Sequence, residues 1–186
     1  FARLSFEHGS TLYSDDFLRF GSQCLSDSQL GCYPGLDDWQ GPEQLRQRLS
    51  SLAKLPIGLQ TIFASRSANL MKLAAKFLFR RCRRVMITDL TWPAYENILL
   101  NEMHRSGCGV HKVAVRSRLL RGEVSAAELL DLLGNEFTGY NCDGLFLPLV
   151  DNLGIRLPVS EITHHLRNLA ELRFCVVDGA QAFENV

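Results

Sequence analysis

The stretch that decides the fold is Phe-Cys-Val-Val-Asp-Gly-Ala-Gln-Ala, residues 174–182. Its apolar half, Phe174 to Val177, has the length and composition of a buried strand. The strand ends on the carboxylate of Asp178, and two small residues then precede the amide of Gln181. Open α/β sheets place ligand contacts at the carboxyl ends of their strands, and small residues let a flat ligand approach the backbone. On these residues alone, a binding site and an ordinary strand-to-loop turn are equally favoured.

The chain before this stretch alternates between helix-like and strand-like segments from residue 41 onward. Ser125 and Glu128 form the capping-box pattern that opens a helix. Helices are predicted over 41–52, 68–81, 93–105, 125–133 and 159–172. Strands are predicted over 59–64, 84–88, 109–115, 144–150 and 173–177. This alternation is typical of a mostly parallel sheet with helices on both faces, so we expect an α/β three-layer sandwich.

Composition describes a globular chain with no charge bias. Its 186 residues are 46% hydrophobic, enough for one sizeable core. The first 40 residues are polar, aromatic and rich in turns, so we expect an N-terminal arm over 1–40 and one domain over 41–186. Lys and Arg together number 20 and Asp and Glu together number 20, which gives no electrostatic basis for binding nucleic acid or an anionic membrane.

Neither a membrane segment nor a metal site is expected. No apolar run approaches membrane-spanning length, and the first residues contain no apolar core of a signal peptide, so we expect a cytoplasmic protein. The six cysteines form no Cys-x-x-Cys pair and fit no zinc spacing, and reduced thiols account for them most simply. His164 and His165 are adjacent on a predicted helix and therefore point to different faces.

Polar or aromatic residues follow three of the predicted strands. Hydroxyls and free backbone N–H groups in Ser65-Arg66-Ser67 can bind an anion at a helix start, although such residues more often serve as a plain N-cap. Trp92 offers a face on which a flat ring can stack, or it anchors its loop in the core. The Asn152 amide can donate to an oxyanion; Asp151 is the alternative, and either can cap a turn.

The segment Val-Val-Asp-Gly-Ala-Gln-Ala, residues 176–182, resembles the aspartate-strand motif of class V aminotransferases. These are fold type I pyridoxal phosphate (PLP) enzymes, related to cysteine desulfurases, kynureninases and isopenicillin N epimerase. The resemblance implies that Asp178 pairs with the protonated pyridine nitrogen of PLP and that Gln181 lies near the phenolic oxygen of PLP. A buried carboxylate keeps the ring protonated, and the protonated ring acts as the electron sink.

The same resemblance implies roles for the other residues. Ser65, Arg66 and Ser67 occupy the place of the family's phosphate-binding segment, although Arg66 stands where Gly is usual and Ala68 where Thr is usual. Trp92 takes the place of the ring that stacks on PLP, where cysteine desulfurases usually have His. Asn152 is expected to contact the phenolic oxygen of PLP.

In this family a lysine on the strand after the aspartate motif holds PLP covalently. The lysines of this chain, at positions 54, 72, 76 and 112, all precede that motif. We therefore expect this lysine to lie beyond this chain. The chain would then be an incomplete large domain that is inactive alone. The resemblance implies a homodimeric enzyme acting on an amino acid by transamination, epimerisation or cleavage at Cβ or Cγ.

A non-catalytic protein of the same fold, acting as a binding partner or scaffold, is the alternative. The departures at Arg66 and Ala68 and the missing lysine favour it, and the intact pair of Asp178 and Gln181 opposes it. A nucleotide-binding domain is less favoured, because no Gly-x-Gly-x-x-Gly follows a strand.

Overall fold

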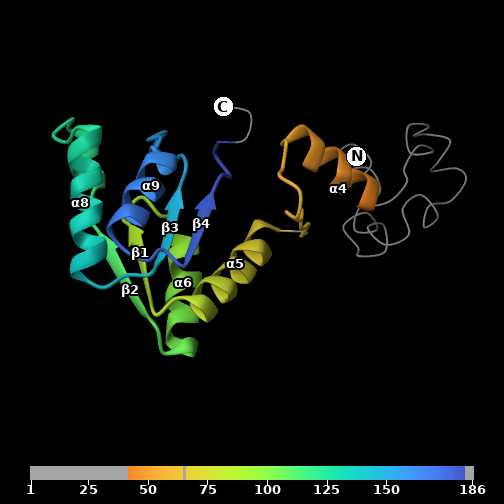
Figure 1. The fold of residues 1–186 in the computed structure, drawn as a ribbon, viewed down its shortest axis with the longest axis horizontal. Coiled ribbons are helices and arrows are strands. Elements are labelled where there is room, and N and C mark those ends of the chain that lie inside the picture. The colour runs from red at the N-terminus through yellow and green to blue at the C-terminus, as the bar shows by residue number, and fades with distance from the viewer. Residues whose placement is uncertain (1–41, 65, 183–186) are drawn as a thin grey trace, which may run out of the picture. The chain divides into compact units, whose positions relative to one another are not determined.

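The computed structural model describes residues 42–64 and 66–182 (Figure 1). By internal contacts the chain divides into two compact units, 1–65 and 66–186. The predicted arm over 1–40 lies outside the described residues. In the first unit, helix α4 (Pro42–Leu52) begins at the proline that the sequence places in its first turn.

The strand predicted over 59–64 is wrong. These residues form no strand, and Leu59 and Ile62 are exposed. The segment bonds to α4 instead, through the hydroxyls of Ser50 and Thr61 at 2.8 Å, and the Arg46 guanidinium lies 5.8 Å from the Phe63 ring centre. Residues of strand-like composition form a strand only where a neighbouring strand satisfies their backbone, and the described part of this unit has none.

The second unit contains a four-stranded parallel sheet with strand order β2-β1-β3-β4. Four of the predicted strands are confirmed, with bounds β1 (Arg84–Thr88), β2 (Gly109–Val113), β3 (Gly144–Pro148) and β4 (Phe174–Asp178). β3 pairs with β4 along its whole length, from Gly144 opposite Phe174 to Pro148 opposite Asp178. The carboxyl ends of these two strands therefore lie level at one edge of the sheet.

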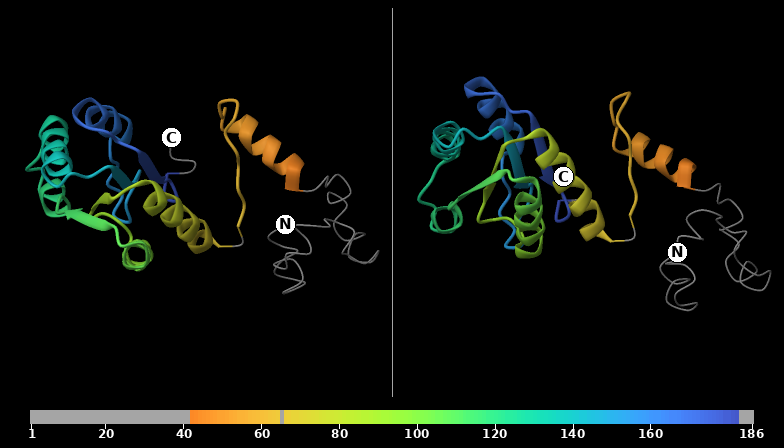
Figure 2. Two further views of the ribbon diagram at one scale, coloured as in Figure 1. Left: turned by 60° about the horizontal axis from the view of Figure 1, so that its bottom comes forward. Right: turned by 90° about the horizontal axis from the view of Figure 1, so that it is seen from below.

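Helices cover both faces of this sheet (Figure 2). They are α5 (Ser67–Arg81), α6 (Pro93–Ser106), α7 (Arg116–Leu120), α8 (Ala126–Gly139) and α9 (Val159–Leu169). One hydrophobic core joins α5 and α6 to Val85 and Ile87 of β1, and the other joins α8 and α9 to Met86 between them. Because successive strand residues point to opposite faces, β1 contributes to both cores. The predicted three-layer α/β architecture is confirmed.

β2 ends two residues before its predicted end because of Asp89. Its Oδ1 accepts from the N–H of Val115 at 2.9 Å and from the N–H of Arg116 at 3.0 Å. These donors turn away from the sheet and begin α7, a five-residue helix that the sequence patterns did not predict. A distant carboxylate thus decides where the strand stops.

The capping box at the start of α8 is confirmed. The Ser125 hydroxyl accepts from the N–H of Glu128 at 3.3 Å, and the Glu128 carboxylate accepts from the N–H of Ser125 at 2.8 Å. The Ser125 hydroxyl also donates to this carboxylate at 2.7 Å, and the two bonds that the carboxylate accepts, from the main chain first and from the hydroxyl, lower the pKa of Glu128. α8 runs beyond the predicted Leu133 to Gly139, because Phe137 continues its buried face.

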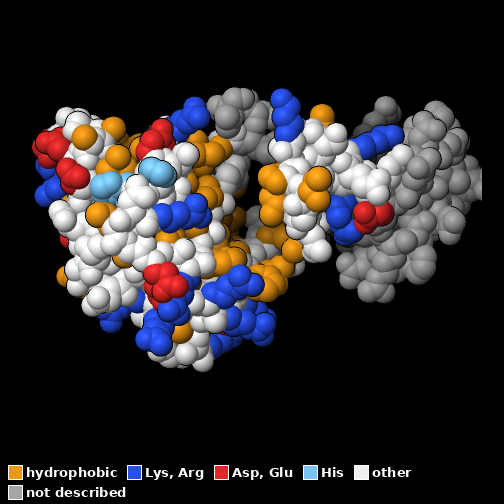
Figure 3. All heavy atoms as spheres, viewed as in Figure 1, with side chains coloured by type: hydrophobic (Ala, Val, Ile, Leu, Met, Phe, Trp, Pro, Cys, Tyr) orange, Lys and Arg blue, Asp and Glu red, His pale blue; other side chains and the backbone are white. Residues whose placement is uncertain are grey.

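The amino end of the parallel sheet is rich in arginine. At the amino end α5 finishes on Arg80 and Arg81, and Arg83 and Arg84 lead into β1. Figure 3 shows Lys and Arg side chains gathered at this end of the second unit. No helix in the described ranges is long and apolar enough to cross a bilayer.

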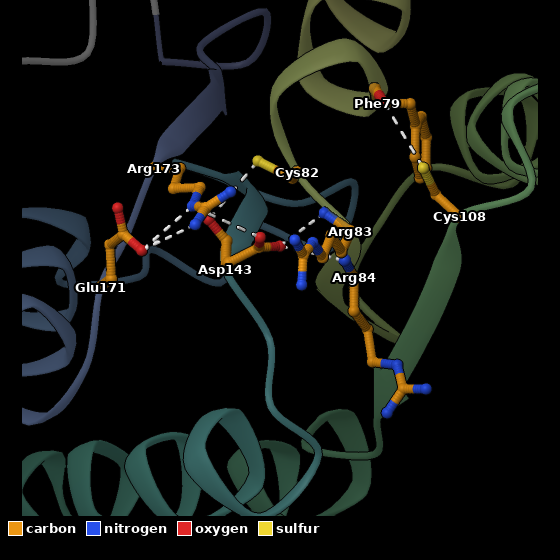
Figure 4. Close-up of polar contacts among 8 residues, drawn as sticks. All are labelled: Phe79, Cys82, Arg83, Arg84, Cys108, Asp143, Glu171 and Arg173. Carbon is orange, nitrogen blue, oxygen red and sulfur yellow. Dashed lines mark hydrogen bonds and ion pairs between the residues drawn. The ribbon is translucent and has the colours of Figure 1, made fainter.

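Asp143 joins three strands at this basic end (Figure 4). Its Oδ1 accepts from the N–H groups of Arg83 and Arg84 at 2.8 and 3.0 Å, and its Oδ2 lies 3.7 Å from Nε of Arg173. Gly144 follows, where an added Cβ would lie 2.7 Å from Sγ of Cys82. The close approach of β3 to the end of α5 therefore requires glycine at position 144.

Candidate functional site

A pocket of about 290 Å³ lies at the carboxyl edge of the sheet. Five of the residues singled out in the sequence line it: Ser67, Trp92, Asn152, Asp178 and Gln181. They come from the start of α5, from the segments that follow β1 and β3, and from the end of β4 and the segment after it. Carboxyl ends of parallel strands meet at one edge, which brings residues that are distant in sequence into a single cavity.

Asp178 is the last residue of β4 and is half-buried. Its Oδ1 accepts from the N–H of Ala180 at 3.0 Å, and this bond holds the carboxylate against the turn that follows. Its main-chain carbonyl accepts from the N–H of Leu149 at 2.8 Å. The segments after β3 and β4 are therefore fixed next to each other.

Trp92 immediately precedes α6 and is 49% exposed. It belongs to neither hydrophobic core, so an anchoring role in the core does not explain it. Its carbonyl accepts from the N–H groups of Tyr95 and Glu96, both at 2.9 Å, which fixes the backbone under the ring. Tyr95 also lines the pocket, and sequence reasoning missed it because it lies within a helix pattern.

The serine segment is only partly at the pocket. Ser67 begins α5 and lines the cavity, whereas Arg66 is an exposed N-cap residue whose side chain makes no capping bond and which does not line the cavity. Ser65 lies outside the described residues. The first turn of a helix leaves backbone N–H groups without an intrahelical acceptor, so α5 offers anion-binding donors next to Ser67.

The two residues after β3 have different positions. Asp151 is 4% exposed, and its Oδ1 accepts from the N–H groups of Leu153 and Ile155, both at 2.8 Å. It therefore caps the turn, which is the structural role that the sequence left open. Asn152 is exposed and lines the pocket beside it. Gly154 completes this turn at a φ of 83°, a conformation that favours glycine.

Three buried oxygens near this edge have no hydrogen-bond partner among the described residues: Thr88 Oγ1, Thr91 Oγ1 and Asp151 Oδ2. Buried polar atoms are nearly always paired with protein, water or ligand, so their gathering at the ends of β1 and β3 is unusual. Sequence patterns did not single out either threonine, because a threonine at a strand end is common.

The lining of the pocket includes two carboxylates, of Asp151 and Asp178, and no Lys or Arg side chain from the described residues. Lys72 and Lys76 line a different groove, and Lys112 pairs with Glu96. No group of three or more His, Cys, Asp or Glu side chains in the described ranges could hold a metal ion. The pocket therefore favours a ligand with cationic or donor groups facing the carboxylates.

Two solved structures of the cystine C-S lyase C-DES are similar to this chain. One is a mutant with glycine covalently linked to its PLP cofactor, with 20% sequence identity and a TM-score of 0.53. The other is C-DES in complex with its reaction product cysteine persulfide, with 18% identity and the same TM-score. Each comparison covers 96% of this chain and 44% of the C-DES chain.

The chain has the fold of C-DES. The predicted resemblance to fold type I PLP enzymes is thus confirmed at the level of fold. The chain spans less than half the length of C-DES. No protein-family model matches the sequence, and none of the curated proteins compared with it is a match.

Proposed function

We propose that the pocket at the carboxyl edge binds pyridoxal 5'-phosphate and that the protein is a PLP-dependent enzyme acting on an amino acid. One observation carries the proposal: the carboxylate of Asp178, the ring of Trp92 and the first residue of α5 line the same cavity. A flat, cationic heterocycle with a phosphate needs these three groups together. The C-DES fold supports the choice of PLP among such heterocycles.

The residues present fit this cofactor by their chemistry. Asp178, with one oxygen held by Ala180, would accept a hydrogen bond from the protonated pyridine nitrogen. Trp92 would stack on the ring, and Ser67 with the first turn of α5 would bind the phosphate. The assignment of Ser65 and Arg66 to the phosphate stays a prediction, since Arg66 does not line the cavity and Ser65 lies outside the described residues. The amides of Asn152 and Gln181 would donate to the phenolic oxygen in a second set of contacts.

When bound, PLP would withdraw electrons from the Cα of an amino acid, and the role of this chain is to hold the ring protonated and oriented. A half-buried carboxylate stabilises the ring proton more than water does. No lysine of the described residues lines the pocket, so we propose that the covalently binding lysine follows Val186 in a longer protein. Transamination, epimerisation and cleavage at Cβ or Cγ all fall within this proposal, as do a homodimer and a cytoplasmic location.

A scaffold of the same fold is the second candidate. The absence of lysine from the described lining favours it, because a protein that acts only as a binding partner or scaffold needs no lysine to hold PLP covalently. The two candidates differ in the longer protein: an enzyme holds PLP covalently on one lysine, and a scaffold does not.

Pyridoxamine 5'-phosphate is the sharpest probe, because it carries the ring and phosphate of the cofactor but binds without a lysine. A Trp39→Phe background leaves Trp92 as the single tryptophan. We expect saturable quenching of Trp92 fluorescence on titration. Asp178→Asn should weaken binding at least tenfold, because hydrogen bonds to charged groups contribute roughly 1.5–3 kcal/mol.

Asp143→Asn is the matched control, since Asp143 also accepts two main-chain bonds but lies at the opposite end of the sheet. It should change affinity less than twofold. Unsaturable quenching in the parent chain would overturn PLP binding. Equal affinity in the Asp178→Asn and parent chains would overturn the assigned role of Asp178.

A further inference from the structure

Positive charge is concentrated in one part of this neutral chain. Residues 66–88 contain seven Lys and Arg side chains and no Asp or Glu. They are Arg66, Lys72, Lys76, Arg80, Arg81, Arg83 and Arg84. Most of them lie on α5, whose exposed face therefore carries cations without acidic neighbours along the helix.

A groove of about 190 Å³ runs between α5 and α6 on this side. Its lining consists of Lys72, Lys76, Ile98, Asn101, Glu102 and Arg105. None of these residues lines the pocket that contains Asp178. The groove is thus a second cavity of the same unit, built from the outer faces of two helices.

The cations of the groove are poorly compensated. Lys72 and Lys76 are one turn apart on α5, where like charges destabilise a helix, and neither ammonium group has a hydrogen-bond or ion-pair partner within the described part of the chain. Glu102 is the single acid of the lining and lies 3.9 Å from Nη1 of Arg105. Three cations and one carboxylate leave an excess of two positive charges.

Lys112 of the same unit, in contrast, has its charge neutralised by a carboxylate. Nζ of Lys112 lies 2.8 and 2.9 Å from the two carboxylate oxygens of Glu96, which is also on α6. The same helix therefore neutralises a lysine on its β2 side and leaves the lysines on its α5 side without an acid of their own.

We propose that this groove binds a divalent oxyanion of the phosphate type, either free phosphate or a phosphate monoester. Two lysine ammonium groups and the Arg105 guanidinium neutralise a dianion, and the Asn101 amide supplies a further donor. The groove has room for several water-sized groups of roughly 30 Å³ each, which is enough for a phosphate with a small substituent.

The test is a ¹⁵N-NMR titration of the chain with inorganic phosphate and, separately, with glycerol 3-phosphate, at constant ionic strength. We expect saturable shifts of the main-chain amides of Lys72, Lys76, Asn101 and Arg105. Tighter binding of glycerol 3-phosphate identifies a monoester as the ligand class, and tighter binding of phosphate identifies the free ion.

Lys72→Gln/Lys76→Gln should weaken this binding at least tenfold. Arg118→Gln/Arg167→Gln removes the same charge from exposed positions on α7 and α9 and should change it less than twofold. Asp178→Asn should leave it unchanged, which separates this groove from the proposed cofactor pocket. Unsaturable shifts, or equal weakening by the two double variants, would overturn the proposal, because simple screening of charge would then explain them.

Discussion

The main-chain N–H of Leu149 donates to the carbonyl oxygen of Asp178 across 2.8 Å. This bond lies one residue beyond the last paired residue of β3, Pro148, which is opposite Asp178. It keeps the two strands together as far as the edge where their loops begin. For this reason Asn152 and Gln181, which follow different strands, line the same cavity.

Gly144→Ala should destabilise the protein by about 1–3 kcal/mol, the usual cost of overpacking. The added Cβ would lie 2.7 Å from Sγ and 2.8 Å from Cβ of Cys82, and a Cβ atom moves only if its backbone moves with it. Gly139→Ala is the control, because nothing lies within 4 Å of its added Cβ at the end of α8. Urea denaturation should give the control unchanged or higher stability; equal losses in both variants would contradict the packing argument.

Ser125→Ala should lower the free energy of unfolding by about 1 kcal/mol, the typical contribution of an N-cap serine. The variant loses the hydroxyl that accepts from the N–H of Glu128. Thermal denaturation followed by circular dichroism measures the loss. Ser160→Ala, on the exposed first turn of α9, is a suitable comparison and should lose less.

Glu128→Ala should show a dependence on pH. The pKa of Glu128 is lowered in the folded chain, chiefly by the N–H of Ser125, so its stabilisation is present above the pKa of an unfolded glutamate. It is lost as the pH falls through the lower folded pKa. The stability difference between parent and variant should therefore be largest near pH 7 and shrink below about pH 4. A difference that stays constant from pH 7 to pH 3 would refute this.

Alkaline pH should weaken the fold through its thiols. Burial is the main cause that raises the pKa of Cys82, Cys142 and Cys175 to about 11. An unfolded thiol loses its proton near pH 8.5, whereas these folded thiols keep theirs. The free energy of unfolding should therefore fall as the pH rises from about 9 to about 11. Cys142→Ala should make this decline shallower in urea titrations, and an identical slope would count against it.

PLP followed by borohydride should not modify one lysine of this chain preferentially. None of Lys72, Lys76 and Lys112 lines the proposed cofactor pocket: the first two line the groove between α5 and α6, and Lys112 pairs with Glu96. Peptide mass spectrometry should find substoichiometric labelling that is divided between Lys72 and Lys76, where PLP can enter the proposed phosphate groove as a monoester. Stoichiometric labelling of a single lysine among positions 54, 72, 76 and 112 would show that this chain carries a covalent site of its own.

Sequence patterns predicted the four strands of the sheet but not the residues at which all of them end. β1 matches its prediction residue for residue, because its apolar run is bounded by charge on one side and a turn on the other. β2 and α7 were misjudged because their boundary depends on Asp89, which lies far away in the chain. The run over 59–64 has strand composition, but composition does not reveal that the described first unit offers it no neighbouring strand.

The sequence singled out residues of the candidate site that end or follow a strand, and it missed Tyr95 within a helix and two common threonines near the end of β1. Trp92 stood out because it follows a strand and Asp178 because it ends one, and both line the pocket. Tyr95 was missed because it fits a helical pattern. Arg66 belongs to the expected segment, but its exposed position at the N-cap depends on how α5 begins, which no residue pattern specifies.

The all-parallel sheet has a consequence for how fast this chain acquires its structure. Parallel neighbours need a crossover connection, and here the N–H of Arg84 bonds to the carboxylate of Asp143, 59 residues further along the chain. Such contacts require a long loop to close before any pairing energy is gained, which slows folding relative to helical bundles. While the crossovers remain open, the apolar runs of β3 and β4 stay accessible to other chains. Synthesis at low temperature or with chaperones should therefore raise the soluble yield more than added salt does.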